Sequence, residues 1–131
     1  GGRAEPEDRD AIDTALREAE EEVGLPRDRV EVIGTLPTYT TVTNFVVTPV
    51  VGLVAPDVAL RPDPFEVAEV FEVPMSFLMD PAHHQRHLFD GPGGHRQFYS
   101  MPWRPDPATR DYFIWGATAA MLRNLYRFLS A

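Results

Sequence analysis

The chain has 131 residues, which is enough for one compact domain with a hydrophobic core. Hydrophobic residues make up 44% of it, a fraction typical of globular proteins that argues against disorder. The net charge of −8 argues against a nucleic-acid or anionic-membrane partner. No apolar run approaches the roughly 18 to 20 residues that span a bilayer, and the opening Gly-Gly-Arg is not typical of a signal peptide.

Cysteine is absent, which removes disulfides, thiolate zinc sites and cysteine nucleophiles from the options for these residues. The absence fits a reducing compartment, and we expect a cytoplasmic protein.

The first predicted helix covers residues 10–23. Asp10 is a suitable N-cap, and Gly24 followed by Pro26 is a typical stop signal. Apolar residues recur at helical spacing and form one stripe, which we expect to face the core: Ile12, Ala15, Leu16, Ala19 and Val23.

Three strands are predicted next, over residues 30–36, 44–54 and 66–74. The second is almost continuously apolar, so we expect it to be central in its sheet. Pro49 lies inside it and predicts a local bulge or edge position. The third alternates between apolar and acidic residues, as a half-buried strand does.

The last part of the chain predicts a short helical turn at residues 75–80 and a hairpin around the glycine-proline turn at 90–95. Residues 112–129 begin as a strand and continue as a second helix. We expect its buried face to comprise Ala119, Leu122, Leu125, Tyr126 and Leu129. Two helices with several strands predict an α/β sandwich forming a single domain.

Four glutamates occupy residues 18–22 of the first helix. Glu18, Glu21 and Glu22 share a face opposite the apolar stripe, whereas Glu20 falls away from them. Arg17 lies one turn before Glu21, so the two can pair.

This cluster has two interpretations, a solvated acidic face or a cation site. Like charges one turn apart destabilise a helix, and the chain has no lysine to interleave with them. Clustered carboxylates are the ligands that Mg²⁺ and Mn²⁺ prefer, commonly together with substrate phosphates. The cation site is therefore the sharper hypothesis.

The segment resembles the Nudix box, G-x5-E-x7-R-E-U-x-E-E-x-G-U, in which U is a bulky aliphatic residue. Residues 17–25, "REAEEEVGL", match its second half, with Ala19 as a small substitute for U. The resemblance implies a Nudix-type α/β/α sandwich with a mixed β-sheet.

The first half of the box departs from this spacing. Strict spacing would put the box Gly at Arg3 and the box Glu at Arg9, so the loop from Gly2 is one residue longer. Asp8 or Asp10 is the candidate substitute for that Glu. The lengthened form "GG…D…TALREAEEEVGL" is similar to the coenzyme A diphosphatase branch of the family.

Flanking segments extend the resemblance over nearly all of the chain: residues 30–54, 66–78 and 112–122. Members of this branch carry two or three strands before the Gly-Gly. We therefore expect the N-terminal strands of the family to be missing from this sequence.

The resemblance implies Mg²⁺- or Mn²⁺-dependent hydrolysis of coenzyme A or an acyl derivative to 3′,5′-ADP and (acyl-)4′-phosphopantetheine. It implies metal binding by Glu18, Glu21 and Glu22, with a backbone carbonyl of Gly1 or Gly2. Arg17 would orient a box glutamate. The general base is left open between Glu18 and two acidic residues of the third predicted strand: Glu66 and Glu69.

The loop "PTYTTVTN" joins two predicted strands beside the box. Its Tyr39, Thr41 and Asn44 are candidate substrate contacts, with an ordinary polar connection as the alternative. Two arginines, Arg86 and Arg96, are weaker candidates for contacting an anionic phosphate. The four histidines of the segment are expected in a solvated loop rather than in a metal site, and the tryptophans in the core: His83, His84, His87, His95, Trp103 and Trp115.

We therefore expect an enzyme with a small-molecule substrate and no nucleic-acid or membrane partner, and a homodimer stays open as its assembly. Two other readings also stay open. One is a Nudix hydrolase acting on ADP-ribose or a dinucleotide, and the other is a non-catalytic binding domain that kept the fold.

Overall fold

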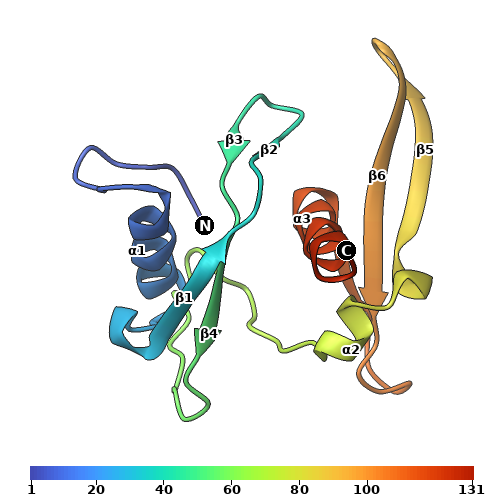
Figure 1. Ribbon diagram of the computed structural model, residues 1–131. Coiled ribbons are helices and arrows are strands. Elements are labelled where there is room, and N and C mark those ends of the chain that lie inside the picture. The colour runs from blue at the N-terminus through green and yellow to red at the C-terminus, as the bar shows by residue number, and fades with distance from the viewer. The chain divides into compact units, whose positions relative to one another are not determined.

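The computed structural model describes residues 1–131. Its elements in chain order (Figure 1) are α1 (Ala11–Val23), η1 (Arg27–Arg29), β1 (Val30–Thr35), β2 (Tyr39–Thr40), β3 (Val46–Val47), β4 (Val50–Val54), α2 (Met75–Leu78), η2 (Pro81–His83), β5 (Gln85–Gly91), β6 (Gly94–Trp103), β7 (Tyr112–Trp115) and α3 (Gly116–Leu129). None of the helices is both long and apolar enough to span a bilayer.

The chain divides into two compact units. The first comprises Gly1–Thr40 and Asn44–Phe71, and the second comprises Thr41–Thr43 and Glu72–Ala131. The first unit therefore holds the whole of the predicted metal-binding helix.

Helix α1 begins and ends where its capping residues predict. The side chain of Asp10 accepts a hydrogen bond from the backbone N–H of Asp13 at 2.8 Å, which satisfies one free donor of the first turn. Gly24 adopts the left-handed conformation at φ 69°, and its N–H donates to the carbonyl of Glu20 at 3.0 Å. The predicted helix over residues 10–23 is confirmed.

The predicted strand over residues 44–54 is split in two. β4 pairs antiparallel with β1, while β3 pairs antiparallel with β2 in a separate two-stranded sheet. Pro49 lies in the gap because it has no N–H for a ladder, and its carbonyl accepts from the N–H of Leu36 at 2.9 Å. The expectation of one central strand was wrong, and β4 has a single neighbour.

Residues 66–74 form no strand, contrary to the prediction from their alternation. Asp63 starts a turn here: its side chain accepts from the N–H of Phe65 at 2.9 Å, and its carbonyl accepts from Val67 at 2.8 Å. This Asx turn competes with strand pairing for the backbone donors, so the segment continues as an irregular connection.

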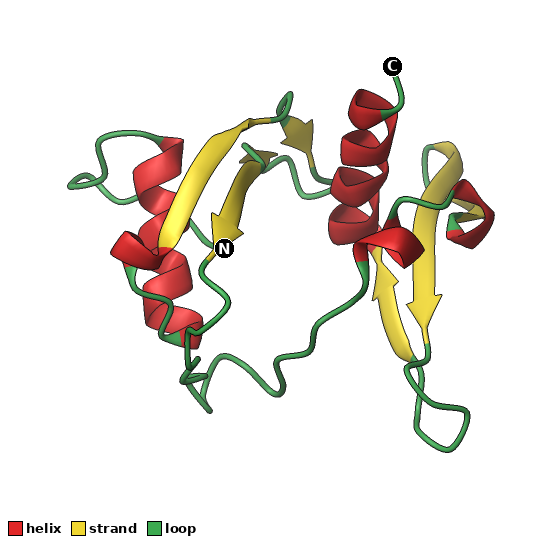
Figure 2. Ribbon diagram, turned by 60° about the horizontal axis from the view of Figure 1, so that its bottom comes forward, coloured by secondary structure: helices red, strands yellow, loops and turns green.

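The second unit is a three-stranded antiparallel sheet in the order β5-β6-β7, with α3 against it (Figure 2). The hairpin between β5 and β6 turns at Pro92 and Gly93, as predicted from the glycine-proline run. The buried core of the second unit contains Leu78, Met101 and Ala119. Helix α2 and the strand-to-helix passage from β7 to α3 are also confirmed.

The α/β class predicted from the sequence is therefore confirmed. All observed strand pairs are antiparallel and belong to three small sheets, so the strands form no mixed sheet. Neither tryptophan is buried: Trp103 is half-buried, and Trp115 is 57% exposed, which corrects its assignment to the core.

Candidate active site on helix α1

Glu18 and Glu22 stand one turn apart on α1, and their carboxyl groups are close neighbours. Their side chains are only 14% and 23% exposed. Burial, followed by the hydrogen-bonding contact with Glu22, raises the pKa of the Glu18 carboxyl above its usual value. Both carboxylate oxygens of Glu22 also accept from the amino nitrogen of Gly1, at 3.0 and 3.1 Å. Glu18 and Glu22 thus form a partly desolvated pair of acidic side chains.

The backbone at Gly2 lies against the same pair. A Cβ atom built on Gly2 would overlap the carboxylate of Glu18. Only glycine brings the main chain this close to a carboxylate. The loop that precedes α1 is thereby held next to the acidic pair.

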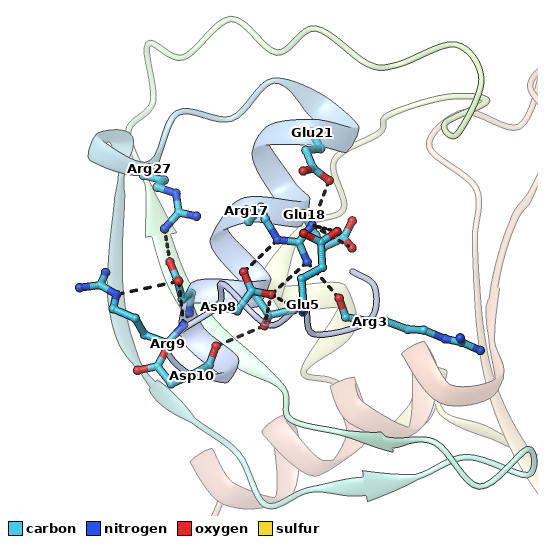
Figure 3. Close-up of polar contacts among 11 residues, drawn as sticks. Arg3, Glu5, Asp8, Arg9, Asp10, Arg17, Glu18, Glu21 and Arg27 are labelled. Atoms are coloured by element: carbon cyan, nitrogen blue, oxygen red, sulfur yellow. Dashed lines mark hydrogen bonds and ion pairs between the residues drawn. The ribbon is translucent and has the colours of Figure 1, made fainter.

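Arg17 organises the loop around the start of the helix (Figure 3). Its Nε and Nη2 donate to the two carboxylate oxygens of Asp8 at 3.0 and 3.1 Å, in a bidentate pair. Nη2 also donates to the carbonyl of Arg3 at 2.9 Å, and Nη1 donates to Glu21 at 3.1 Å. With 15% of its side chain exposed, Arg17 ties the loop to the helix.

Asp8 is the acidic residue that the loop presents to Arg17. Its side chain is 4% exposed and also accepts from the hydroxyl of Thr14 at 2.9 Å and from the N–H of Glu5 at 2.8 Å. These hydrogen bonds, that from Arg17 first, hold the pKa of Asp8 far below its usual value. Asp10, the other candidate, instead caps α1.

The structure separates the remaining glutamates. Glu21 is exposed and its carboxylate turns to Arg17, which also lies 3.5 Å from Glu18. Glu20 is exposed, as predicted. No group of three or more acidic or histidine side chains is arranged to hold a metal ion. The assignment of all three glutamates as metal ligands therefore stays a prediction, of which the structure brings together Glu18 and Glu22.

A second polar network, which sequence reasoning missed, supports the first turn of α1. The buried side chain of Asp13 accepts from the N–H of Arg9 at 3.0 Å and from the guanidinium of Arg27. The hydrogen bond from Arg27, followed by that from Arg9, lowers the pKa of Asp13. The spacing of Asp10 and Asp13, which resembles a capping box, was the signal that could have found it.

The segment after β4 is anchored at the carboxyl end of α1. The N–H of Arg61 donates to the carbonyl of Val23, and the N–H of Asp63 donates to the carbonyl of Glu22, both at 2.8 Å. These bonds satisfy carbonyls that a helix end leaves free. Glu66 follows three residues later with an exposed side chain, so this candidate base lies on a loop tied to the box helix rather than on a strand.

The predicted substrate loop forms the turn between β2 and β3. Tyr39 is half-buried in β2, the hydroxyls of Thr41 and Thr43 lie 3.0 Å apart, and Asn44 adopts a left-handed conformation at φ 65°. The guanidinium of Arg3 lies 4.9 Å from the ring centre of Phe45, the residue after Asn44. Arg3 belongs to the Gly-Gly loop, so the two loops contact each other there.

The histidines do not form the solvated loop that the sequence suggested. His83 and His84 are half-buried, and their ring nitrogens lie within 2.8 and 2.7 Å of the carbonyls of Phe77 and Leu78. His87 lies on β5 and bonds the hydroxyl of Ser100 at 2.7 Å. His95 is exposed beside Asp90. None of them belongs to a group of three or more side chains arranged to hold a metal ion.

The class of domain is defined by two features together. One is helix α1 with its Arg17 and glutamates, and the other is the glycine loop held against that helix. The family model of the NUDIX domain matches residues 1–99, and the chain belongs to this family. Nudix hydrolases generally use divalent metal ions, which the carboxylate donors on α1 suit.

Three curated relatives carry the name "Uncharacterized Nudix hydrolase NudL". The protein from Escherichia coli (strain K12) is 41% identical over 126 residues, which cover 95% of this chain and 62% of the relative. Those from Escherichia coli O1:K1 / APEC and Shigella boydii serotype 18 are each 40% identical over the same lengths. The chain thus spans 62% of the length of these relatives.

Proposed function

We propose that the protein hydrolyses the diphosphate bond of coenzyme A or an acyl-coenzyme A, giving 3′,5′-ADP and (acyl-)4′-phosphopantetheine. The observation that carries the proposal is the desolvated pair of Glu18 and Glu22 beside Gly2. Two acids held this close repel each other once ionised, so the arrangement favours a bound cation over an empty surface.

The donor set fits Mg²⁺ or Mn²⁺. Carboxylate and backbone oxygens are the hard ligands that these ions prefer, and no softer donor is present on α1. Glu18 and Glu22 would hold the ion, with the carbonyl of Gly2 and with Glu21 as further ligands. When bound, the ion supplies charge neutralisation for the diphosphate and lowers the pKa of a water molecule.

The other residues have supporting roles in this proposal. Arg17, oriented by Asp8, positions the box loop and Glu21. A carboxylate must accept the proton of the attacking water, and Glu18, Glu66 and Glu69 remain the three candidates for it. Glu18 lies beside Glu22 on α1, whereas the loop of Glu66 is tied to the end of the same helix.

Coenzyme A is favoured over other diphosphates by the lengthened loop of the box. Asp8 follows Gly2 by six positions and bonds Arg17, and the extra residue lies between Asp8 and Arg17 in the sequence. This "GG…D" form resembles the coenzyme A diphosphatase branch. The β2–β3 turn, with Tyr39, Thr41 and Asn44, is the candidate substrate contact because it adjoins the Gly-Gly loop at Phe45. The lack of cysteine fits the cytoplasm as the compartment.

A substrate panel tests the proposal. The full chain is incubated with coenzyme A, ADP-ribose and a dinucleoside polyphosphate, each with Mg²⁺, with Mn²⁺ or with a chelator, and the products are separated by chromatography. We expect metal-dependent release of 3′,5′-ADP from coenzyme A. Cleavage of only the other two substrates would replace the proposed substrate, and no metal-dependent cleavage of any would contradict the enzymatic proposal.

A further inference from the structure

Arg123 of α3 is a half-buried cation with no acidic partner. Its Nη1 lies 3.2 Å from Nδ1 of His84, and its guanidinium lies over the ring of Tyr99, 4.7 Å from the ring centre. It takes part in none of the ion pairs of the structure, although half-buried arginines are usually paired.

The contacts of Arg123 fix its position while leaving most of its donors available. Nε2 of His84 lies 2.7 Å from the carbonyl of Leu78, which can only accept, so this nitrogen carries the proton. Nδ1 is then an acceptor for Arg123, and His84 is a neutral partner. One of the five N–H donors of the guanidinium is used, and the stacking on Tyr99 occupies a face rather than an edge.

A second arginine is the cross-strand neighbour of Tyr99. Arg86 of β5 is the cross-strand partner of Tyr99, so their side chains leave the sheet on the same side and about 5 Å apart at Cβ. Arg86 is exposed and forms no ion pair. The face with Tyr99 is the one that α3 covers, because Tyr99 packs against the core of Met101 and Ala119.

The charges around this pair suit an anion. Helix α3 has no acidic residue, and residues 72–131 hold six arginines and five acidic residues. Residues 1–71 hold six arginines and fifteen acidic residues, so the negative charge of the chain is concentrated there. An anion that approaches Arg86 and Arg123 meets no carboxylate partnered with either of them.

We propose that Arg123 and Arg86, on either side of Tyr99, form a binding site for a phosphomonoester group. A guanidinium edge matches the geometry of two phosphate oxygens, and two cations bind a dianion more strongly than one cation does. The proposal does not depend on the diphosphatase activity, because the site lies outside the acidic helix and binds without a metal ion. Failure of either proposal leaves the other standing.

The test titrates the full chain with inorganic phosphate and with methyl phosphate, in chelator and at constant ionic strength. NMR follows the side-chain Nε–H of Arg123 and the imidazole nitrogens of His84. We expect saturable shifts of these signals with both ligands, and much weaker shifts with dimethyl phosphate, which carries a single charge.

Three variants localise the binding. Arg123→Gln and the exposed Arg86→Gln should each weaken phosphate binding about tenfold, since each removes a charged hydrogen-bond donor. Arg110→Gln is the matched control: Arg110 is exposed, its guanidinium lies 5.3 Å from the ring centre of Tyr112, and its replacement should change the affinity less than twofold. Absence of saturation, or an equal loss in Arg86→Gln and Arg110→Gln, would overturn the proposal.

Discussion

Asp8 and Arg17 form a two-point ion pair that links the glycine loop to helix α1, with both carboxylate oxygens 3.0 to 3.1 Å from guanidinium nitrogens. They are nine positions apart in the sequence. The pair explains how a box loop with one extra residue still reaches the helix: the acid comes from Asp8, where strict spacing would have placed Arg9.

Replacing Asp8 tests this positioning role. Asp8→Asn keeps the shape but removes the charge that orients Arg17, and we expect kcat for diphosphate hydrolysis to fall about tenfold to a hundredfold. Asp10→Asn is the control, because asparagine caps a helix as well as aspartate does. Equal kcat values for the two variants would contradict the role given to Asp8. Thermal unfolding of both reports any loss of the fold.

Glu22 should be needed for activity rather than for stability. Glu22→Gln removes a metal ligand and also a like-charge contact with Glu18, so activity should fall at least about a hundredfold. The free energy of unfolding without metal should stay within about 0.5 kcal/mol of the parent value. Glu20→Gln, on the same helix but exposed, should retain activity. Unfolding of Glu22→Gln would instead indicate a structural role.

Activity should be lost when Gly2 gains a side chain but kept when Gly1 does. The Cβ of Gly2→Ala would displace the carboxylate of Glu18, a flexible side chain, so we expect at least about a tenfold loss of activity with little loss of stability. Gly1→Ala meets nothing within 4 Å and should behave like the parent. Steady-state kinetics and thermal unfolding compare the two.

Acid should weaken the contact between Asp13 and Arg27. The pKa of Asp13 is lowered in the folded state, so its ionised form stabilises the protein at every pH above the ordinary value of 3.8. That contribution is lost as the pH falls below about 4. Asp13→Asn should therefore be less stable than the parent at pH 7 and approach it in acid. A difference that grows towards low pH would reverse the predicted sign.

The left-handed backbone conformation at position 24 requires a glycine there. Gly24→Ala should lower the free energy of unfolding by about 1 to 2 kcal/mol, because a Cβ is disfavoured at φ 69° and would lie 3.0 Å from the backbone nitrogen of Arg61. Gly34→Ala, with open space around it, should change it by less than about 0.5 kcal/mol. Chemical denaturation measures both values.

The helices were predictable because their signals are local. Asp10 and Gly24 fix the ends of α1 through hydrogen bonds to residues within one turn, and the same spacing put Glu18 and Glu22 on one face. The strand errors have the opposite cause. Whether residues 66–74 pair depends on partners far along the chain, and the turn at Asp63 occupies the N–H groups of Glu66 and Val67 at the start of that stretch.

The candidate site was predictable as a list of residues but not as an arrangement. The i,i+4 spacing predicted the contact of Glu21 with Arg17, whereas the contact of Asp8 with the same guanidinium depends on how the loop folds. The network of Asp13 and Arg27 joins residues fourteen positions apart, and the site at Arg123 needs a sheet register that no local pattern contains. These are contacts of tertiary structure, which hydrophobic periodicity does not encode.

Binding of Mn²⁺ tests most directly whether Glu18 and Glu22 together form a cation site. Electron paramagnetic resonance measures the concentration of the free ion in this titration. We expect saturable binding to the full chain at pH 7, loss of at least about tenfold in affinity in Glu22→Gln, and parent-like binding in Glu20→Gln. Equal binding by the parent and Glu22→Gln, or no saturable binding by the parent, would contradict it.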